Sequence, residues 1–239
     1  MRLIKIDMHI HTCLSPCADI SISPKRIVER AYKKGLNMIF ITDHNSIENA
    51  EAAMKSSNKY KDLKVYPGME ITSKEEVHTL ALFENLDDAH KTQNYIYSYL
   101  PDTDKEQEYK EQIIANENDE VEGFLKKSLF NAVNISVDGV VSLIHKNNGL
   151  AIAAHIDRES FSVIGQLGFI PEELQYDALE ISPNMSLEEA EEVYREYNSR
   201  FKFIKGSDSH SLESIGSNYT ELSLRGNSFK SLSSSLNMQ

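Results

Sequence analysis

Short apolar runs recur along the chain and alternate with segments of helical periodicity. Seven of these runs have the length and the β-branched content typical of strands. They cover residues 3–11, 38–44, 64–71, 78–83, 150–155, 178–181 and 203–210. Because helical segments separate most of the runs, the pattern predicts βα units around a parallel sheet.

Two helices have clear start signals. Ser23 is an N-cap candidate, and Pro24 occupies the first helical position of a segment that Gly35 ends. Ser186 and Glu189 have the spacing of a capping box, which predicts a second helix before the last apolar run.

The segment 84–138 is longer than an ordinary βα connection and rich in polar residues. Its apolar positions between 113 and 129 predict a helical insertion near the mouth of a barrel. This insertion could be a lid over the mouth or a solvent-exposed segment without a functional role, and the sequence favours neither interpretation. The tail after Ser228 is rich in Ser and Asn, and we expect it to fray.

Length and charge narrow the possible classes of protein. The chain has 239 residues, and its 25 basic and 37 acidic side chains give a formal charge of −12. Residues 1–239 are expected to form one domain that does not bind long duplex nucleic acid, because phosphate contacts need clustered Lys and Arg. No apolar stretch is long enough to cross a membrane. Two cysteines and no signal-peptide pattern favour a cytoplasmic location.

Histidines and acidic residues gather at the ends of the predicted strands. A period of two places His9 and His11 on one face of the first strand. In a parallel barrel the carboxyl ends of the strands meet at one mouth, so donors on different strands come within reach of each other. His78 fits less well because it opens its run. The strand-end donors are His9, His11, His44, Glu70, His78, His155, Asp208 and His210, with Asp19 as a further candidate.

This set of nine imidazole and carboxylate groups is too large for one ion, since a zinc site uses about four ligands. Two or three divalent ions such as Zn, Mn or Fe fit the donor types, with Glu70 as the candidate bridging carboxylate. The alternative is a polar cleft in which each histidine is satisfied by local hydrogen bonds.

The same residues resemble the motifs of the PHP (polymerase and histidinol phosphatase) superfamily of metal-dependent phosphoesterases. The resemblance spans nearly the whole chain and implies an α/β fold, a distorted (β/α)7 barrel with metals at its carboxyl-terminal mouth. The matching segments are Asp7-Met-His-Ile-His11, Thr42-Asp-His-Asn45, Pro67-Gly-Met-Glu70, Ala154-His-Ile-Asp-Arg158 and Ser207-Asp-Ser-His210.

The resemblance also implies a division of the ligands. His9, His11, Glu70, His155 and Asp208 would hold a buried pair of ions, and Asp19, His44, His78 and His210 would complete the cluster. The loop after His11 departs from the family pattern. Alignment backward from the helix start favours Asp19 as its ligand, whereas counting forward from His11 favours Cys17.

The implied activity is hydrolysis of a phosphomonoester or phosphodiester of a small metabolite or nucleotide by a metal-bridging hydroxide. His44 or His210 would protonate the leaving group if it is not a ligand. Arg158 either clamps phosphate oxygens or is an ordinary surface arginine. Neither the physiological substrate nor the oligomeric state follows from the sequence.

Two other functions share part of this pattern. An amidohydrolase also begins with His-x-His on its first strand, but it usually bridges its metals with a carbamylated lysine, and here Glu70 stands in the equivalent place. A non-catalytic, metal-bound interaction module is the other alternative.

Overall fold

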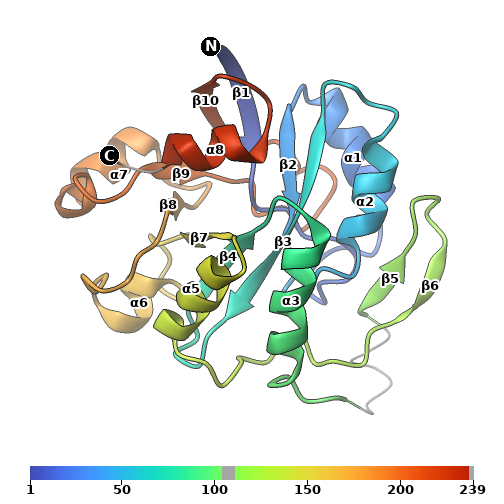
Figure 1. Ribbon diagram of the computed structural model, residues 1–239, viewed down its shortest axis with the longest axis horizontal. Coiled ribbons are helices and arrows are strands. Elements are labelled where there is room, and N and C mark those ends of the chain that lie inside the picture. The colour runs from blue at the N-terminus through green and yellow to red at the C-terminus, as the bar shows by residue number, and fades with distance from the viewer. Residues whose placement is uncertain (104–110, 237–239) are drawn as a thin grey trace.

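A computed structural model describes residues 1–103 and 111–236, and its centre is one eight-stranded sheet (Figure 1). The strand order is β10-β1-β2-β3-β4-β7-β8-β9. These strands are β1 (Arg2–Asp7), β2 (Met38–Ile41), β3 (Lys64–Thr72), β4 (His78–Leu82), β7 (Leu150–Ala153), β8 (Ala178–Ile181), β9 (Phe203–Lys205) and β10 (Thr220–Leu224). All seven predicted strands are therefore present, and β10 is an addition.

The sheet is mixed rather than wholly parallel. β1, β2 and β3 are parallel to one another, as are β7, β8 and β9. β4 runs antiparallel to both β3 and β7, and β10 runs antiparallel to β1. Beyond the regular strands, a parallel bridge between Ile10 and Ser209 joins the segment after β1 to the segment after β9, so that the sheet nearly closes into a distorted barrel.

The reversed direction of β4 explains the position of His78. Thr72 at the end of β3 pairs with His78 at the start of β4. The first residue of an antiparallel strand lies beside the last residues of its neighbours, so His78 reaches the mouth although it opens its strand.

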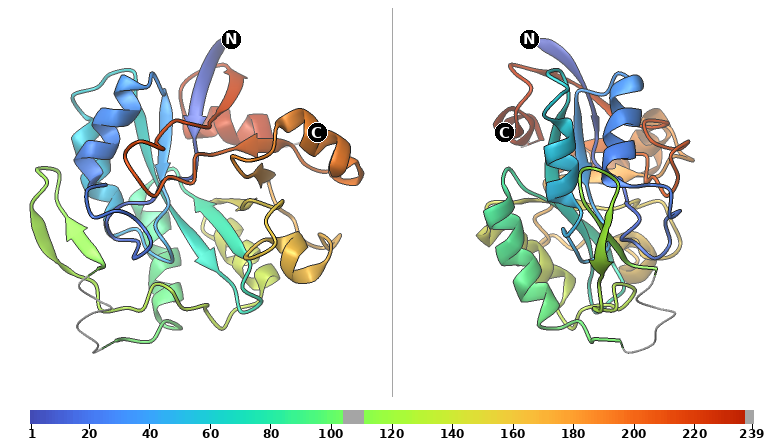
Figure 2. Two further views of the ribbon diagram at one scale, coloured as in Figure 1. Left: turned by 180° about the vertical axis from the view of Figure 1, so that it is seen from behind. Right: turned by 90° about the vertical axis from the view of Figure 1, so that its right-hand side faces the viewer.

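Except for α8, the helices pack on the outer face of the sheet, and their ends largely follow the predicted signals (Figure 2). Pro24 is the first residue of α1, and the capping box of Ser186 and Glu189 is formed at the start of α7. α7 ends at Val193, and a 3-10 turn, η1 (Arg195–Tyr197), follows it. The helices are α1 (Pro24–Lys33), α2 (Ala50–Ser57), α3 (Leu86–Tyr97), α5 (Val137–Lys146), α6 (Val163–Leu167), α7 (Leu187–Val193) and α8 (Phe229–Leu236).

The carboxyl-terminal segment does not fray as expected within the described residues. It forms α8, whose Phe229, Leu232 and Leu236 are buried in the apolar cluster that also contains Ile4 and Phe40. The Ser- and Asn-rich composition hid the helical spacing of these three apolar residues. α8 lies beside β10 and the amino-terminal strand (Figure 1).

The insertion 84–138 is only partly helical, which corrects the prediction. α3 forms, but the apolar positions from 113 onward build a hairpin of β5 (Ile113–Ala115) and β6 (Val121–Phe124) beside α2 (Figure 2). Asn49 holds this hairpin to the barrel by accepting from the amide of Ala115 and donating to the carbonyl of Ile113. Residues 104–110 of the insertion lie outside the described part of the chain.

None of the helices in the described residues combines the length and apolar character that a membrane crossing requires.

Candidate metal centre

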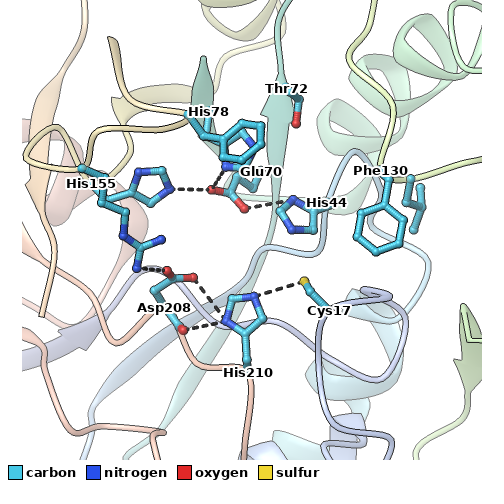
Figure 3. Close-up of a pocket in the computed structure, with 12 residues that line it drawn as sticks. Cys17, His44, Glu70, Thr72, His78, Phe130, His155, Asp208 and His210 are labelled. Carbon is cyan, nitrogen blue, oxygen red and sulfur yellow. Dashed lines mark hydrogen bonds and ion pairs between the residues drawn. The ribbon is translucent and has the colours of Figure 1, made fainter. Parts of the chain in front are cut away.

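Glu70 stands at the centre of a ring of histidines at the mouth (Figure 3). Its Oε1 atom is 2.7 Å from Nδ1 of His78 and 3.2 Å from Nε2 of His155, and its Oε2 atom is 3.0 Å from Nδ1 of His44. Burial alone raises the pKa of this carboxyl group, but the surrounding histidines outweigh burial and hold the pKa well below its usual value. Glu70 is therefore a carboxylate whose two oxygens face different histidines, as a bridging ligand requires.

His9 and His11 direct their Nε2 atoms into the same space. Nδ1 of His9 is 2.9 Å from Oε2 of Glu180, and a carboxylate only accepts hydrogen bonds, so Nδ1 carries the proton. Nδ1 of His11 is 3.0 Å from Oγ of Ser15, which itself donates to Asp43 at 2.6 Å, so His11 also donates from Nδ1. In the neutral imidazoles both Nε2 atoms therefore present lone pairs, and they are 3.1 Å apart.

Carboxylate oxygens face these two lone pairs. Oδ1 of Asp208 is 3.3 Å from Nε2 of His9 and 3.4 Å from Nε2 of His11. The oxygens of Glu70 are 3.4 Å from the same nitrogens. Buried acceptors repel one another unless a proton or a cation lies between them. Separations of this size are those of neighbouring ligands around one ion at about 2.1 Å, so the donor set fits a divalent metal.

The backbone at the mouth is held in an unusual conformation. His155 and Asp208 have φ angles of 31° and 47°, in the left-handed region that residues other than Gly rarely adopt. Asp7 helps to hold the surrounding loops: its buried carboxylate accepts hydrogen bonds from the amides of Ser207 and Gly216. Such local strain is typical of binding sites, where packing fixes side chains that would otherwise relax.

The loop after His11 brings Cys17, and not Asp19, to the cluster. Possible ligand atoms of His11, Cys17, His44 and His210 all lie within 4.8 Å of one another. The Asp19 carboxylate is exposed and accepts a hydrogen bond of 2.7 Å from the amide of Ser21. The structure thus assembles eight of the nine predicted donors and leaves Asp19 outside.

A cavity of about 290 Å³ is lined by six of these donors, namely His44, Glu70, His78, His155, Asp208 and His210. Arg158 lies in its wall, with Nη2 2.5 Å from Oδ2 of Asp208 and the side chain 40% exposed. The ring of Phe161 stacks on His78 with 4.7 Å between centroids. Phe130 and Leu129, from the insertion, also line the cavity (Figure 3).

The sequence interpretation missed Glu180. It is the one acidic residue of β8, a strand whose four residues are all buried. An acidic side chain within such a strand needs a partner, because burial of an unpaired charge is costly. That signal could have identified Glu180 as a partner of the site, but not which histidine it contacts.

Comparison with known proteins shows what the chain is similar to. The model of the PHP domain family matches residues 7–203, and a PHP-associated model matches residues 184–238. No match was found among curated proteins.

Solved structures with the same fold have diverse activities. The lesion-specific endonuclease Q of Pyrococcus furiosus aligns with a TM-score of 0.71 and 18% identity over 98% of this chain and 56% of that one. A protein of Bifidobacterium adolescentis assigned as a metal-dependent phosphoesterase aligns with a TM-score of 0.64 and 18% identity, over 98% of this chain and 96% of that one. An amidohydrolase of Chromobacterium violaceum aligns with a TM-score of 0.61 and 15% identity, over 98% of this chain and 97% of that one.

These identities establish a shared fold and no more. The chain spans only about half the length of endonuclease Q. A second endonuclease Q structure contains a 27-mer duplex with an abasic lesion at the active site. The prediction that the present chain binds no long duplex nucleic acid, which came from net charge alone, therefore has no support from these comparisons.

Proposed function

The chain belongs to the PHP domain family of metal-dependent hydrolases, and from that premise we propose that it hydrolyses phosphoester bonds in a small phosphorylated metabolite or nucleotide. One observation carries this proposal: buried acceptor groups, Glu70, His155 and Asp208 among them, line one cavity together with the exposed side chain of Arg158. The acceptors suit cations, and the arginine suits a phosphate.

The chain's own side chains would hold two or three divalent ions, with Zn, Mn and Fe as candidates. Bound ions of this kind supply an activated water and positive charge against the phosphoryl oxygens. Glu70 connects the two sides of the centre. We assign the buried ligands as His9, His11, Glu70, His78, His155 and Asp208.

Arg158 would bind the phosphate. One of its guanidinium nitrogens pairs with Asp208, and the side chain is exposed in the cavity wall. A guanidinium has five N–H donors, so donors remain for phosphate oxygens while the group stays fixed by Asp208. Arg158 is in this way placed to orient a phosphate next to the donor cluster.

The rest of the substrate would lie against the apolar side of the cavity. Phe130 is 62% exposed and Phe161 43% exposed, and both line the cavity that contains the donors. Exposed phenyl rings favour contact with an organic group such as a nucleobase. His44 and His210 were expected as general acids only when not ligated. Both lie in the donor cluster, so we assign them to the metal centre and assign proton transfer to the leaving oxygen to solvent in the open cavity.

An amidohydrolase and a non-catalytic module remain the competing functions. The position of Glu70 between His44, His78 and His155 favours a phosphoesterase, because the bridging place holds a glutamate and not a lysine. The chain loaded with Zn²⁺ or Mn²⁺ should be screened against phosphomonoesters, nucleotides, short single strands, duplex DNA with an abasic site and dihydropyrimidine amides.

We expect phosphoester cleavage of the small substrates. His9→Ala should lower it by more than about 100-fold, since loss of a partner of a ligand alone costs about 10–100-fold. His90→Ala is the matched control, because His90 is exposed on α3, outside the donor cluster. Amide cleavage without phosphoester cleavage would reverse the assignment, and a fully metal-loaded protein without turnover would favour the module.

A further inference from the structure

Cys17 lies with two histidines at the open side of the metal centre. Its Sγ atom is 3.1 Å from Nε2 of His210, and a possible ligand atom of His44 is within 4.8 Å of both (Figure 3). Cys17 is exposed, whereas His9 and His11 are fully buried. The sulfur therefore belongs to the part of the cluster nearest the solvent.

The hydrogen bonds of the two histidines leave one ring nitrogen of each for a metal ion beside the sulfur. Nδ1 of His210 is 2.9 Å from the backbone oxygen of Asp208, which only accepts, so Nδ1 is the donor and Nε2 is the nitrogen that a metal ion could bind once the ring is neutral. Nδ1 of His44 is engaged by Glu70 at 3.0 Å, which leaves the Nε2 atom of His44. Cys17, His44 and His210 thus offer one sulfur and two nitrogen ligands.

His11 also has a possible ligand atom within 4.8 Å of those of Cys17, His44 and His210, but it already belongs to the buried part of the centre. Its Nε2 atom is 3.1 Å from Nε2 of His9 and 3.4 Å from Asp208, within the buried part of the centre. A subsite made of Cys17, His44 and His210 therefore has three protein ligands and an open fourth position. Zinc sites with catalytic roles have this composition.

Backbone hydrogen bonds of the loop fix residue 17 toward the histidines. The amide of Ala18 donates to the carbonyl of Ser15 at 2.9 Å, which turns the chain around Cys17. The amide of Asp19 donates to the carbonyl of His210 at 2.9 Å, so the two loops are joined next to the sulfur. Asp19 is thereby placed with its carboxylate on Ser21, away from the cluster.

We propose that Cys17, His44 and His210 form a thiolate-containing subsite that holds the outermost ion and prefers a thiophilic metal such as Zn²⁺ to Mn²⁺. This inference deepens the proposed function and rests on its metal centre. Thiolate ligands select zinc-like ions, whereas imidazole and carboxylate ligands also accept manganese. The two parts of the centre should therefore differ in metal preference.

Cobalt substitution tests the subsite without reference to activity. Co²⁺ bound by a thiolate shows a near-ultraviolet sulfur-to-metal charge-transfer band, and Co²⁺ bound by nitrogen and oxygen does not. We expect the band in the wild-type protein, in Asp19→Asn and in Cys13→Ala, and its loss in Cys17→Ser. Metal analysis after Zn²⁺ loading should find one ion fewer per chain in Cys17→Ser than in the wild type. After Mn²⁺ loading, the wild type should also contain one ion fewer per chain, because the outermost subsite stays empty.

Each result has a defined meaning when circular dichroism shows that the variants are folded. A wild type without the band, a band that survives in Cys17→Ser, or loss of the outermost ion in Asp19→Asn would overturn the subsite. Metal-dependent phosphoester cleavage in a protein that lacks the band would overturn the subsite alone. A cobalt protein that shows the band but cleaves no phosphoester would overturn the proposed function and leave the subsite standing.

Discussion

The imidazole of His9 and the carboxylate of Glu180 form a fully buried pair, with 2.9 Å between Nδ1 and Oε2. The same carboxylate oxygen accepts a hydrogen bond from the amide of His155 at 3.2 Å. Glu180 therefore fixes the ring of one proposed ligand and the backbone of another. A carboxylate behind a metal-binding histidine sets its tautomer and raises its basicity.

Glu180→Gln tests this positioning role. A glutamine preserves the shape and one acceptor oxygen but removes the charge, so we expect metal affinity to fall by about 10-fold, and by about 100-fold in Glu180→Ala. Calorimetric titration with Zn²⁺ measures both changes. Glu173→Gln, at an exposed position, is the control. Unchanged affinity in Glu180→Ala would show that His9 needs no partner.

Gly206→Ala should disturb the same pair from the other side. A methyl group at residue 206 would lie 2.8 Å from Cβ of His9 and would also meet Oε1 of Glu180. Overpacking of this kind costs about 1–3 kcal/mol of unfolding free energy, and displacement of the His9–Glu180 pair should weaken metal binding as well. Urea denaturation and calorimetry report the two effects.

Gly123→Ala is the matched control for this substitution. Gly123 lies in β6, and nothing would be within 4 Å of an added methyl group. We expect the unfolding free energy of Gly123→Ala to change by no more than about 0.5 kcal/mol. Equal destabilisation in the two variants would mean that the close approach to His9 is not the reason why residue 206 must be a glycine.

Arg158→Ala should weaken substrate binding more than it slows turnover. Loss of charge-assisted hydrogen bonds to a phosphate costs about 1.5–3 kcal/mol, which corresponds to a rise in KM of roughly 10–100-fold. Arg158→Lys should recover part of the loss, because it keeps a charge but not the planar fork. Steady-state kinetics with a substrate found in the screen measures both parameters.

A different result would assign Arg158 a role in orienting Asp208 and not in binding phosphate. Its guanidinium also holds the Asp208 carboxylate, so a fall in kcat together with loss of bound metal would mean that Arg158 acts by orienting Asp208. Arg195→Ala, at an exposed position on η1, should change neither parameter.

Apolar patterning was sufficient to predict the seven strands, but not their directions. β4 follows β3 through the short turn 73–77, which allows only an antiparallel return, whereas the prediction assumed parallel units throughout. The expectation that donors lie at strand ends was therefore correct for His44 and His155, but it gave His78 too little weight because His78 begins its strand. The hairpin of β5 and β6 was missed because Ile113 and Val121 fit helical and extended spacing equally well.

The partners of the ligands depend on tertiary contacts that no local pattern encodes. Glu180 is 171 positions from His9, and Cys17 is 193 positions from His210. These pairs meet only when the sheet curves into its nearly closed barrel. The choice between Asp19 and Cys17 was similarly beyond sequence spacing, because it depends on how the amide of Asp19 binds the carbonyl of His210.

The two cysteines should differ sharply in reactivity when metal is removed. Burial raises the pKa of the Cys17 thiol, but hydrogen bonds with His210 and His44 and the charges of these histidines outweigh burial and lower the pKa to about 7. Burial raises the pKa of Cys13 to about 12. Since the thiolate is the nucleophile, iodoacetamide should modify Cys17 at a rate that rises through about pH 7 and should leave Cys13 unmodified.

Mass spectrometry of the metal-free protein over a pH series measures this difference, with Cys13 as the internal control. His210→Asn should move the midpoint for Cys17 toward the ordinary thiol value of about 8.5, because it removes a positive neighbour. A midpoint already at the ordinary value in the wild type would contradict the contact between Cys17 and His210. Excess Zn²⁺ should suppress the reaction at every pH, since a coordinated thiolate is no longer free to attack.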